Sequence, residues 1–150
     1  MEKVKIITRN KKANHDYFIL DKYNCGIVLT GTEIKSIRGG KVSIQDAYCV
    51  VKDGELFIIN MHIAKYEQGN IFNHKETRTR KLLANRSEIR KIHSKVSQEG
   101  LTLIPLSIYI EKGLAKIEIA IAKGKKQYDK REDLKQEVIK RDIEARMKNA

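Results

Sequence analysis

The sequence contains no tryptophan, a single proline, two cysteines and no apolar run of the roughly 18 residues that would span a membrane. We therefore expect no membrane segment, and the first residues lack the long apolar stretch of a signal peptide. Cys25 and Cys49 lie far apart, and neither has a second cysteine at the spacing of a metal site. We expect two reduced, half-buried thiols in a cytoplasmic protein.

Aromatic residues make up only 6% of the chain, and no segment has the ribonucleoprotein signature in which adjacent aromatic residues on a strand stack bases. Stacking of single-stranded bases is therefore a poor primary mode of binding. The four histidines follow no metal-binding pattern, and the run from Gly124 to Lys130 lacks the spacing of a phosphate-binding loop. Nothing in the sequence pairs two carboxylates in one cleft. We predict no catalytic residue, no metal and no cofactor.

What the chain has in excess is positive charge. Lysine and arginine number 31 against 19 acidic residues, which gives a net charge of +12. Residues 123–150 hold ten basic and six acidic residues, so the remainder carries +8. This surplus favours a polyanionic partner, and its clustering favours nucleic acid over a merely soluble basic protein. Three clusters are expected in loops or short helices and not in strands: Arg9, Lys11 and Lys12; Lys35, Arg38 and Lys41; Arg78, Arg80 and Lys81.

Two hairpins give the clearest structural signals. Apolar runs flank Asp53-Gly54, a dipeptide that favours the positive φ angles of a tight turn. Apolar and polar residues alternate over 106–121 on both sides of Lys112-Gly113, which is typical of a half-buried antiparallel hairpin. Pro105 indicates an edge position or a bulge.

Two helices are predicted between the strands. Thr32 is expected to cap a short helix that Gly39-Gly40 would end. Asn85 begins a pattern like a capping box, apolar residues then recur at helical spacing, and Gly100 follows as a stop. The second helix is therefore predicted over 86–99.

Apolar runs at 16–20 and 25–31 add two further short strands, the second ended by Gly31. So many short strands tend to close into a barrel that hides their edges. We predict a mostly β chain: a six-stranded antiparallel OB-like β-barrel with two or three flanking helices over 1–122, and a basic C-terminal tail over 123–150. A two-layer α+β sandwich fits the same elements.

Four segments occur in an order and at a spacing that resemble one known family. They read NKKANHDYFI, GIVLTGTEIKSIRGGKVSIQDAY, TRTRKLLANRSEI and AKGKKQYDKRED, and the similarity runs from about Asn10 to the C-terminus. On these motifs the chain resembles small protein B, the family of tmRNA-binding proteins of bacterial trans-translation. The motifs are several and long, which makes chance a poor explanation.

The resemblance implies an oblong antiparallel barrel of OB-like topology that binds the tRNA-like domain of tmRNA near its elbow. The complex would enter stalled ribosomes, where a switch of template tags the nascent peptide and releases the ribosome. The implied partners are tmRNA and the ribosome, at its decoding centre, mRNA channel and 16S rRNA. Elongation factor Tu and alanyl-tRNA synthetase act indirectly, through the same RNA. A cytoplasmic monomer that catalyses nothing itself is expected.

The resemblance also assigns an RNA-binding set. The basic residues of the first helix motif are expected to meet phosphates, with Glu33 orienting them. Asn24 stands where some members have Glu, although an amide can still hydrogen-bond to RNA. Asn85 has the alternative role of a helix cap, and Leu83 that of a core residue. The tmRNA-binding set is Asn10, Lys11, Lys12, Asn24, Glu33, Lys35, Ser36, Arg38, Lys41, Arg78, Arg80, Lys81, Leu83 and Asn85.

For residues 123–150 the resemblance implies a tail that is disordered alone and helical in the empty mRNA channel of the ribosome. Apolar residues recur at four-residue spacing between Leu134 and Met147, so a helix would carry a narrow apolar stripe. Such a helix is marginal alone and needs a partner surface. A surface helix docked on the barrel by that stripe is the alternative. The ribosome-binding set is Gly124, Lys125, Lys126, Tyr128, Asp129, Lys130 and Arg131.

Two other functions fit the composition. One is a general ribosomal or tRNA-elbow-binding protein with an OB-like barrel, and the other is a small basic enzyme that modifies or cleaves RNA. The RNA recovered with the protein distinguishes them, because it would be one dominant tmRNA, mixed rRNA or processed products respectively.

Overall fold

The computed structural model describes residues 4–125, and the side chains of 70–72 lie outside that description. Within that range the chain forms nine strands, three α-helices and one 3-10 helix. In order these are β1 (Val4–Arg9), α1 (Ala13–Asp16), β2 (Tyr17–Ile27), α2 (Gly31–Arg38), β3 (Val42–Ser43), β4 (Tyr48–Lys52), β5 (Glu55–Ile59), β6 (His62–Ile63), η1 (Glu67–Phe72), β7 (Arg80–Leu83), α3 (Arg86–Glu99), β8 (Thr102–Glu111) and β9 (Leu114–Gly124).

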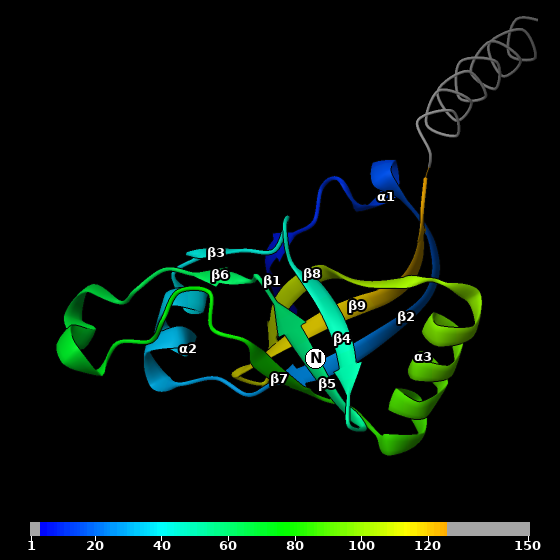
Figure 1. The fold of residues 1–150 in the computed structure, drawn as a ribbon. Helices are drawn as coiled ribbons and strands as arrows, with labels where there is room; N and C mark the ends of the chain where they lie inside the picture. Colours follow the sequence, from blue (N-terminus) through cyan, green and yellow to red (C-terminus); the bar gives the residue numbers. More distant parts are fainter. Residues whose placement is uncertain (1–3, 126–150) are drawn as a thin grey trace, which may run out of the picture.

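Seven strands form one antiparallel sheet in the order β1-β8-β4-β5-β7-β2-β9. Because β8 also pairs with β9, the hydrogen bonds of β8, β4, β5, β7, β2 and β9 close into a ring of six strands (Figure 1). β1 is attached to this ring through β8, and β3 pairs with β6 in a small second sheet. The predicted mostly β, antiparallel architecture is confirmed.

Both predicted hairpins are confirmed. Asp53 and Gly54 have φ angles of 52° and 76°, and Lys112 and Gly113 have φ angles of 53° and 74°. Two consecutive residues with positive φ give the turn a twist that matches the flanking strands. The register between β8 and β9 shifts between Pro105 and Ser107, so the predicted irregularity at the proline is a bulge inside a buried pairing.

The segment before α2 differs from the prediction. A single strand of 11 residues, β2, replaces the two short strands, and Gly31 begins α2 instead of ending a strand. The cap is Thr30 and not Thr32. The Thr30 hydroxyl accepts a hydrogen bond from the Glu33 backbone N–H at 3.4 Å, and the Glu33 carboxylate accepts one from the Thr30 N–H at 2.9 Å. This reciprocal pair forms a capping box in the motif TGTE, two residues earlier than the predicted cap.

Helix α3 has the predicted bounds. Gly100 follows it with φ 63° in the left-handed region, which a residue without Cβ adopts at little cost. Asn85 stands at the N-cap position, but its side chain makes no capping hydrogen bond, so the predicted capping box is wrong.

The core fills the ring and the faces of α2 and α3 that pack on it. Ile37 of α2 and Ile92 of α3 are fully buried, together with Leu56 and Ile117 of the ring. Fully burying an aliphatic side chain of this size is worth about 1.5–3 kcal/mol. α2 and α3 lie on opposite sides of the ring (Figure 1), so these contacts fix where both helices present their outer faces.

Both cysteines are free thiols within this core, Cys25 exposed by 2% and Cys49 by 5%. They are therefore more deeply buried than the predicted half-buried thiols. Burial, with the nearby Glu88 carboxylate, raises the pKa of Cys25 to about 11, and burial also raises the pKa of Cys49. Among the helices of residues 4–125, none is long and apolar enough to cross a membrane.

Candidate nucleic-acid interface

Helix α2 and the loop after it present three cations to solvent. Lys35 and Arg38 lie three residues apart on α2, so they share a face of the helix, and Lys41 follows in the loop. The Arg38 guanidinium donates to the Gly113 carbonyl at 3.3 Å, and the Lys35 ammonium lies 5.2 Å from the centroid of the Tyr66 ring. These contacts orient both side chains, which remain exposed.

Beneath this surface lies a buried ion cluster, defined as Glu33, Arg78 and Arg80. Glu33 and Arg80 are fully buried and joined through Arg80 Nε, while Arg78 Nη2 donates to Glu33 Oε1 at 2.6 Å from a half-exposed position. Arg80 also donates to the Met61 carbonyl at 2.6 Å and to the Glu76 carbonyl at 3.1 Å. Every charge in the cluster therefore has several partners, as buried charges require.

The pKa of Glu33 reflects two opposing causes. Burial disfavours the carboxylate and would raise the pKa, but hydrogen bonds from Arg78, the Thr30 N–H and Arg80 outweigh it and leave the pKa below its ordinary value. Burial lowers the pKa of Arg80, while the Glu33 carboxylate opposes that shift. The cluster therefore holds α2 to β7 through an ionised carboxylate.

Some residues of the predicted RNA-binding set are exposed, whereas others are buried and only support the exposed ones. Glu33, Ser36 and Arg80 are buried, and the Ser36 hydroxyl has no hydrogen-bond partner among the described residues. The prediction that every basic cluster lies outside the strands is wrong, because Arg80 and Lys81 belong to β7 and Arg9 is the last residue of β1. The short RKLL segment carried too little apolar alternation to be recognised as a strand. Lys81 is paired with Glu55 at 3.0 Å on the neighbouring strand.

Beside β7 a groove of about 670 Å³ lies between the β4–β5 turn and α3. Leu83, expected as either core or RNA contact, lines this groove with 52% of its surface exposed, and Asn85 is exposed at the start of α3. Sequence reasoning missed Arg86, Arg90 and His93, which line the groove from α3. The sequence did carry a signal for them, because residues spaced four and three apart on a helix lie on the same face.

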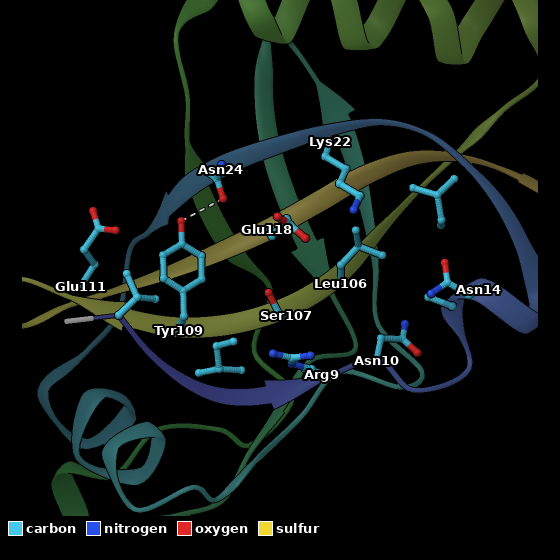
Figure 2. Close-up of a pocket in the computed structure, with 14 residues that line it drawn as sticks. Arg9, Asn10, Asn14, Lys22, Asn24, Leu106, Ser107, Tyr109, Glu111 and Glu118 are labelled. Atoms are coloured by element: carbon cyan, nitrogen blue, oxygen red, sulfur yellow. Dashed lines mark hydrogen bonds between the residues drawn. The ribbon is translucent and has the colours of Figure 1, made fainter. Parts of the chain in front are cut away.

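A second groove, of about 540 Å³, lies between β1 and β2 over a floor of β8 and β9 (Figure 2). Asn10 and Asn24, both in the predicted set, line it together. Asn10 is fixed to β8, since its backbone N–H donates to Leu106 O at 2.8 Å and its side chain to Pro105 O at 3.1 Å. The Tyr109 hydroxyl donates to Asn24 Oδ1 at 2.9 Å.

The cations around this second groove come from both strands. Arg9 and Lys22 line it, and Lys11 and Lys12 are exposed in the turn that leads to α1. Lys22 was missed, because only the register of β2 against β9 places it on the groove side. The groove therefore combines amides with positive charge, a combination suited to RNA bases and phosphates.

The base of the predicted tail is attached to α1. β9 runs to Gly124, two residues beyond the predicted boundary at Ala122, and the Lys125 backbone N–H donates to Asp16 O at 2.9 Å. The Lys125 ammonium donates to Asn14 O at 3.1 Å and lies 4.8 Å from the centroid of the Phe18 ring. The other predicted ribosome-binding residues lie outside the described residues: Lys126, Tyr128, Asp129, Lys130 and Arg131.

A ring of antiparallel strands with helices around it, whose exposed cations gather on one helix and in two grooves, is typical of small basic proteins that bind structured RNA. The chain belongs to the SmpB family, because the family model described as SmpB protein matches residues 7–149.

Curated relatives agree in name and length. An SsrA-binding protein of Oceanobacillus iheyensis is 56% identical over 146 residues, which cover 97% of this chain and 94% of the relative. An SsrA-binding protein of Desulfitobacterium hafniense is 54% identical over 143 residues, covering 95% and 92%. A solved structure described as "tmRNA-SmpB: a journey to the center of the bacterial ribosome" is 44% identical with a TM-score of 0.68, covering 85% of this chain and 93% of that one.

Proposed function

We propose that this chain binds the tRNA-like domain of tmRNA and delivers it to stalled ribosomes in trans-translation. The observation that carries the proposal is membership of the SmpB family over residues 7–149. It is supported by relatives named SsrA-binding protein and by the likeness to a structure described with tmRNA, SmpB and the bacterial ribosome. The net charge of +12 supplies the attraction to RNA that such a role needs.

The exposed cations provide the phosphate contacts in this proposal. Lys35, Arg38 and Lys41 meet the RNA backbone, and the buried ion cluster holds their helix in place. The groove with Asn10 and Asn24 and the groove with Leu83 and Asn85 supply hydrogen bonds and apolar contact to the same RNA.

At the level of the whole chain, the ring of six strands is an OB-like barrel that forms an RNA-binding body, which β9 completes at Gly124, and the residues after Lys125 form a separate tail. The tail carries the ribosome contacts, at the decoding centre and along the vacant mRNA channel. The protein acts as a monomer in the cytoplasm, without catalysis. Elongation factor Tu and alanyl-tRNA synthetase reach it only through tmRNA.

The proposal is tested by the RNA that copurifies with the tagged, full-length protein. Sequencing of crosslinked RNA is expected to return one dominant tmRNA, and purified tmRNA is expected to bind with an affinity that falls linearly on a log–log plot against salt. An unrelated structured RNA of equal length is the control. Mixed rRNA or tRNA in place of tmRNA would support a general elbow-binding protein and overturn the proposal.

A further inference from the structure

A row of four polar side chains crosses the outer face of the sheet in the groove between β1 and β2. The strand registers pair Arg9 with Ser107, Ser107 with Glu118, and Glu118 with Asn24. All four line the groove, and Figure 2 shows them following one another across the four strands. Directly paired residues have Cβ atoms about 4.5–5.5 Å apart, so neighbouring members of the row can contact one ligand.

The amide of Asn24 has a defined orientation within this row. Its Oδ1 accepts the hydrogen bond from the Tyr109 hydroxyl at 2.9 Å, and Tyr109 is itself only 9% exposed, so the donor is held by packing (Figure 2). With Oδ1 engaged, the Nδ2 group is left as a hydrogen-bond donor, and no partner for it occurs within residues 4–125. Asn24 therefore offers a donor to the groove.

Glu118, directly opposite on β9, offers acceptors. It is half-buried, yet its carboxylate makes neither a hydrogen bond nor an ion pair with any described residue. Glu111, which also lines the groove, is in contrast paired with the Lys116 ammonium at 3.1 Å. Its oxygens are therefore available to the groove, and a ligand with N–H groups can donate to both of them without breaking an internal bond.

We propose that this groove binds an unstacked guanine of the RNA, with Asn24 Nδ2 donating to guanine O6 and Glu118 accepting from N1–H and the N2 amino group. The proposal rests on the proposed function and names the base that one of its grooves recognises. A donor beside two acceptors is complementary to the Watson–Crick edge of guanine, and single-stranded RNA bases are commonly read on that edge. Arg9 and Lys22 lie where they can meet the phosphate of the same nucleotide, and Ile6 and Leu106 supply an apolar wall.

The other bases satisfy fewer of these groups. Adenine offers one amino donor and one acceptor, which leaves one Glu118 oxygen unused. Uracil offers a single N–H between two carbonyl oxygens, so the carboxylate would face one of them. Cytosine presents two acceptors and one donor, the reverse of what the pair requires. The groove, at about 540 Å³, is within the range of about 300–1,000 Å³ usual for small-molecule sites.

The test uses the full chain, labelled with ¹⁵N and titrated separately with GMP, AMP, CMP and UMP. GMP is expected to shift the Asn24 side-chain amide resonances and to bind about 5- to 150-fold more tightly than CMP, the discrimination usual for one bidentate base contact. Added tmRNA should displace GMP. Equal affinities for the four nucleotides would overturn the proposal, and GMP binding that tmRNA leaves untouched would assign the groove to free nucleotides.

Three variants locate the effect. Glu118→Gln keeps the shape but replaces one acceptor with a donor, and Asn24→Asp removes the donor; each should abolish the preference for GMP. Tyr109→Phe should weaken it by freeing the amide to rotate. Glu99→Gln, an exposed position at the end of α3, is the matched control and should retain it.

Affinity for tmRNA, measured on the same samples, separates the two proposals. If the wild-type protein binds tmRNA but shows no preference for GMP, only the proposed guanine site is refuted. Wild-type protein that fails to bind tmRNA would sink the proposed function. If Glu118→Gln fails to fold, Asn24→Asp alone decides, because its side chain is exposed and nearly isosteric.

Discussion

Replacing Glu33 with Gln should destabilise the protein strongly without disturbing the start of α2. Gln serves at this position of a capping box as well as Glu does, so the reciprocal bond with Thr30 is retained. What is lost is the negative charge beside the fully buried Arg80. Arg80 would keep its bonds to the Met61 and Glu76 carbonyls, but its own charge would be uncompensated.

The magnitude follows from that burial. Breaking a buried ion pair by removing one partner costs about 3–5 kcal/mol, and a domain of this kind has about 5–15 kcal/mol in total. At about 2–4 °C per kcal/mol for a chain of this size, the melting temperature of Glu33→Gln should fall by about 6–20 °C. The exposed Glu99→Gln should change stability by less than about 0.5 kcal/mol.

The assay is urea unfolding followed by circular dichroism at pH 7 and again near pH 3. Because the pKa of folded Glu33 is lowered, its stabilisation is present above the unfolded value of about 4.3 and is lost as the pH falls through the folded pKa. The gap between wild type and Glu33→Gln should therefore narrow at pH 3. In a double-mutant cycle with Arg80→Met, the double variant should lose less unfolding free energy than the sum of the losses of the two single variants. A loss below about 1 kcal/mol at pH 7 would refute the reasoning.

Three further predictions concern RNA and local structure. Arg38→Ala combined with Lys41→Ala should weaken tmRNA binding and make the slope of log affinity against log salt shallower by about 1.4–1.8 in filter-binding assays, and an unchanged slope would place the phosphate contacts elsewhere. Truncation after Lys125, which preserves all of β9, should leave tmRNA affinity intact but abolish peptide tagging on stalled ribosomes in a reconstituted translation assay; a large loss of affinity would contradict this division. Asn85→Ala should cost less than the usual 1 kcal/mol or so of a capping residue because its side chain makes no capping bond, whereas Gly100→Ala should cost about 1–2 kcal/mol because of its positive φ, both measured by urea unfolding.

The features read correctly from the sequence are those set by neighbours in the chain. The turns at Asp53-Gly54 and Lys112-Gly113 depend on the backbone preferences of two residues, and the end of α3 depends on Gly100 alone. The error at α2 has the same origin, because Thr30 and Thr32 both precede a helical segment. Only the reach of Glu33 back to the Thr30 N–H selects the first of them.

The features missed depend on pairings between distant segments. The number of short strands predicted closure, but no local pattern specifies that β8 closes the ring by pairing with both β4 and β9. The groove row needs the register of four strands, and each of its three pairings follows a register shift, so a one-residue error would turn Glu118 to the other face. The family resemblance pointed to Asn24 but not to Glu118, because only the strand register shows that the two residues are paired.

The buried ion cluster explains why counting charges misjudged the segment Arg78–Lys81. In a sequence these cations look equivalent, but each has a carboxylate partner in the structure. Arg80 is buried against Glu33, the half-exposed Arg78 also pairs with Glu33, and Lys81 is paired with Glu55. The cations of α2 are different, because Lys35, Arg38 and Lys41 form no ion pair with a carboxylate among the residues that the structure describes. A phosphate that approaches them displaces no internal carboxylate, so their attraction to RNA is not reduced by an internal ion pair. Because Glu33 is fully buried, we propose that it supports RNA binding only by holding α2 in place, so that its loss would lower binding and stability together.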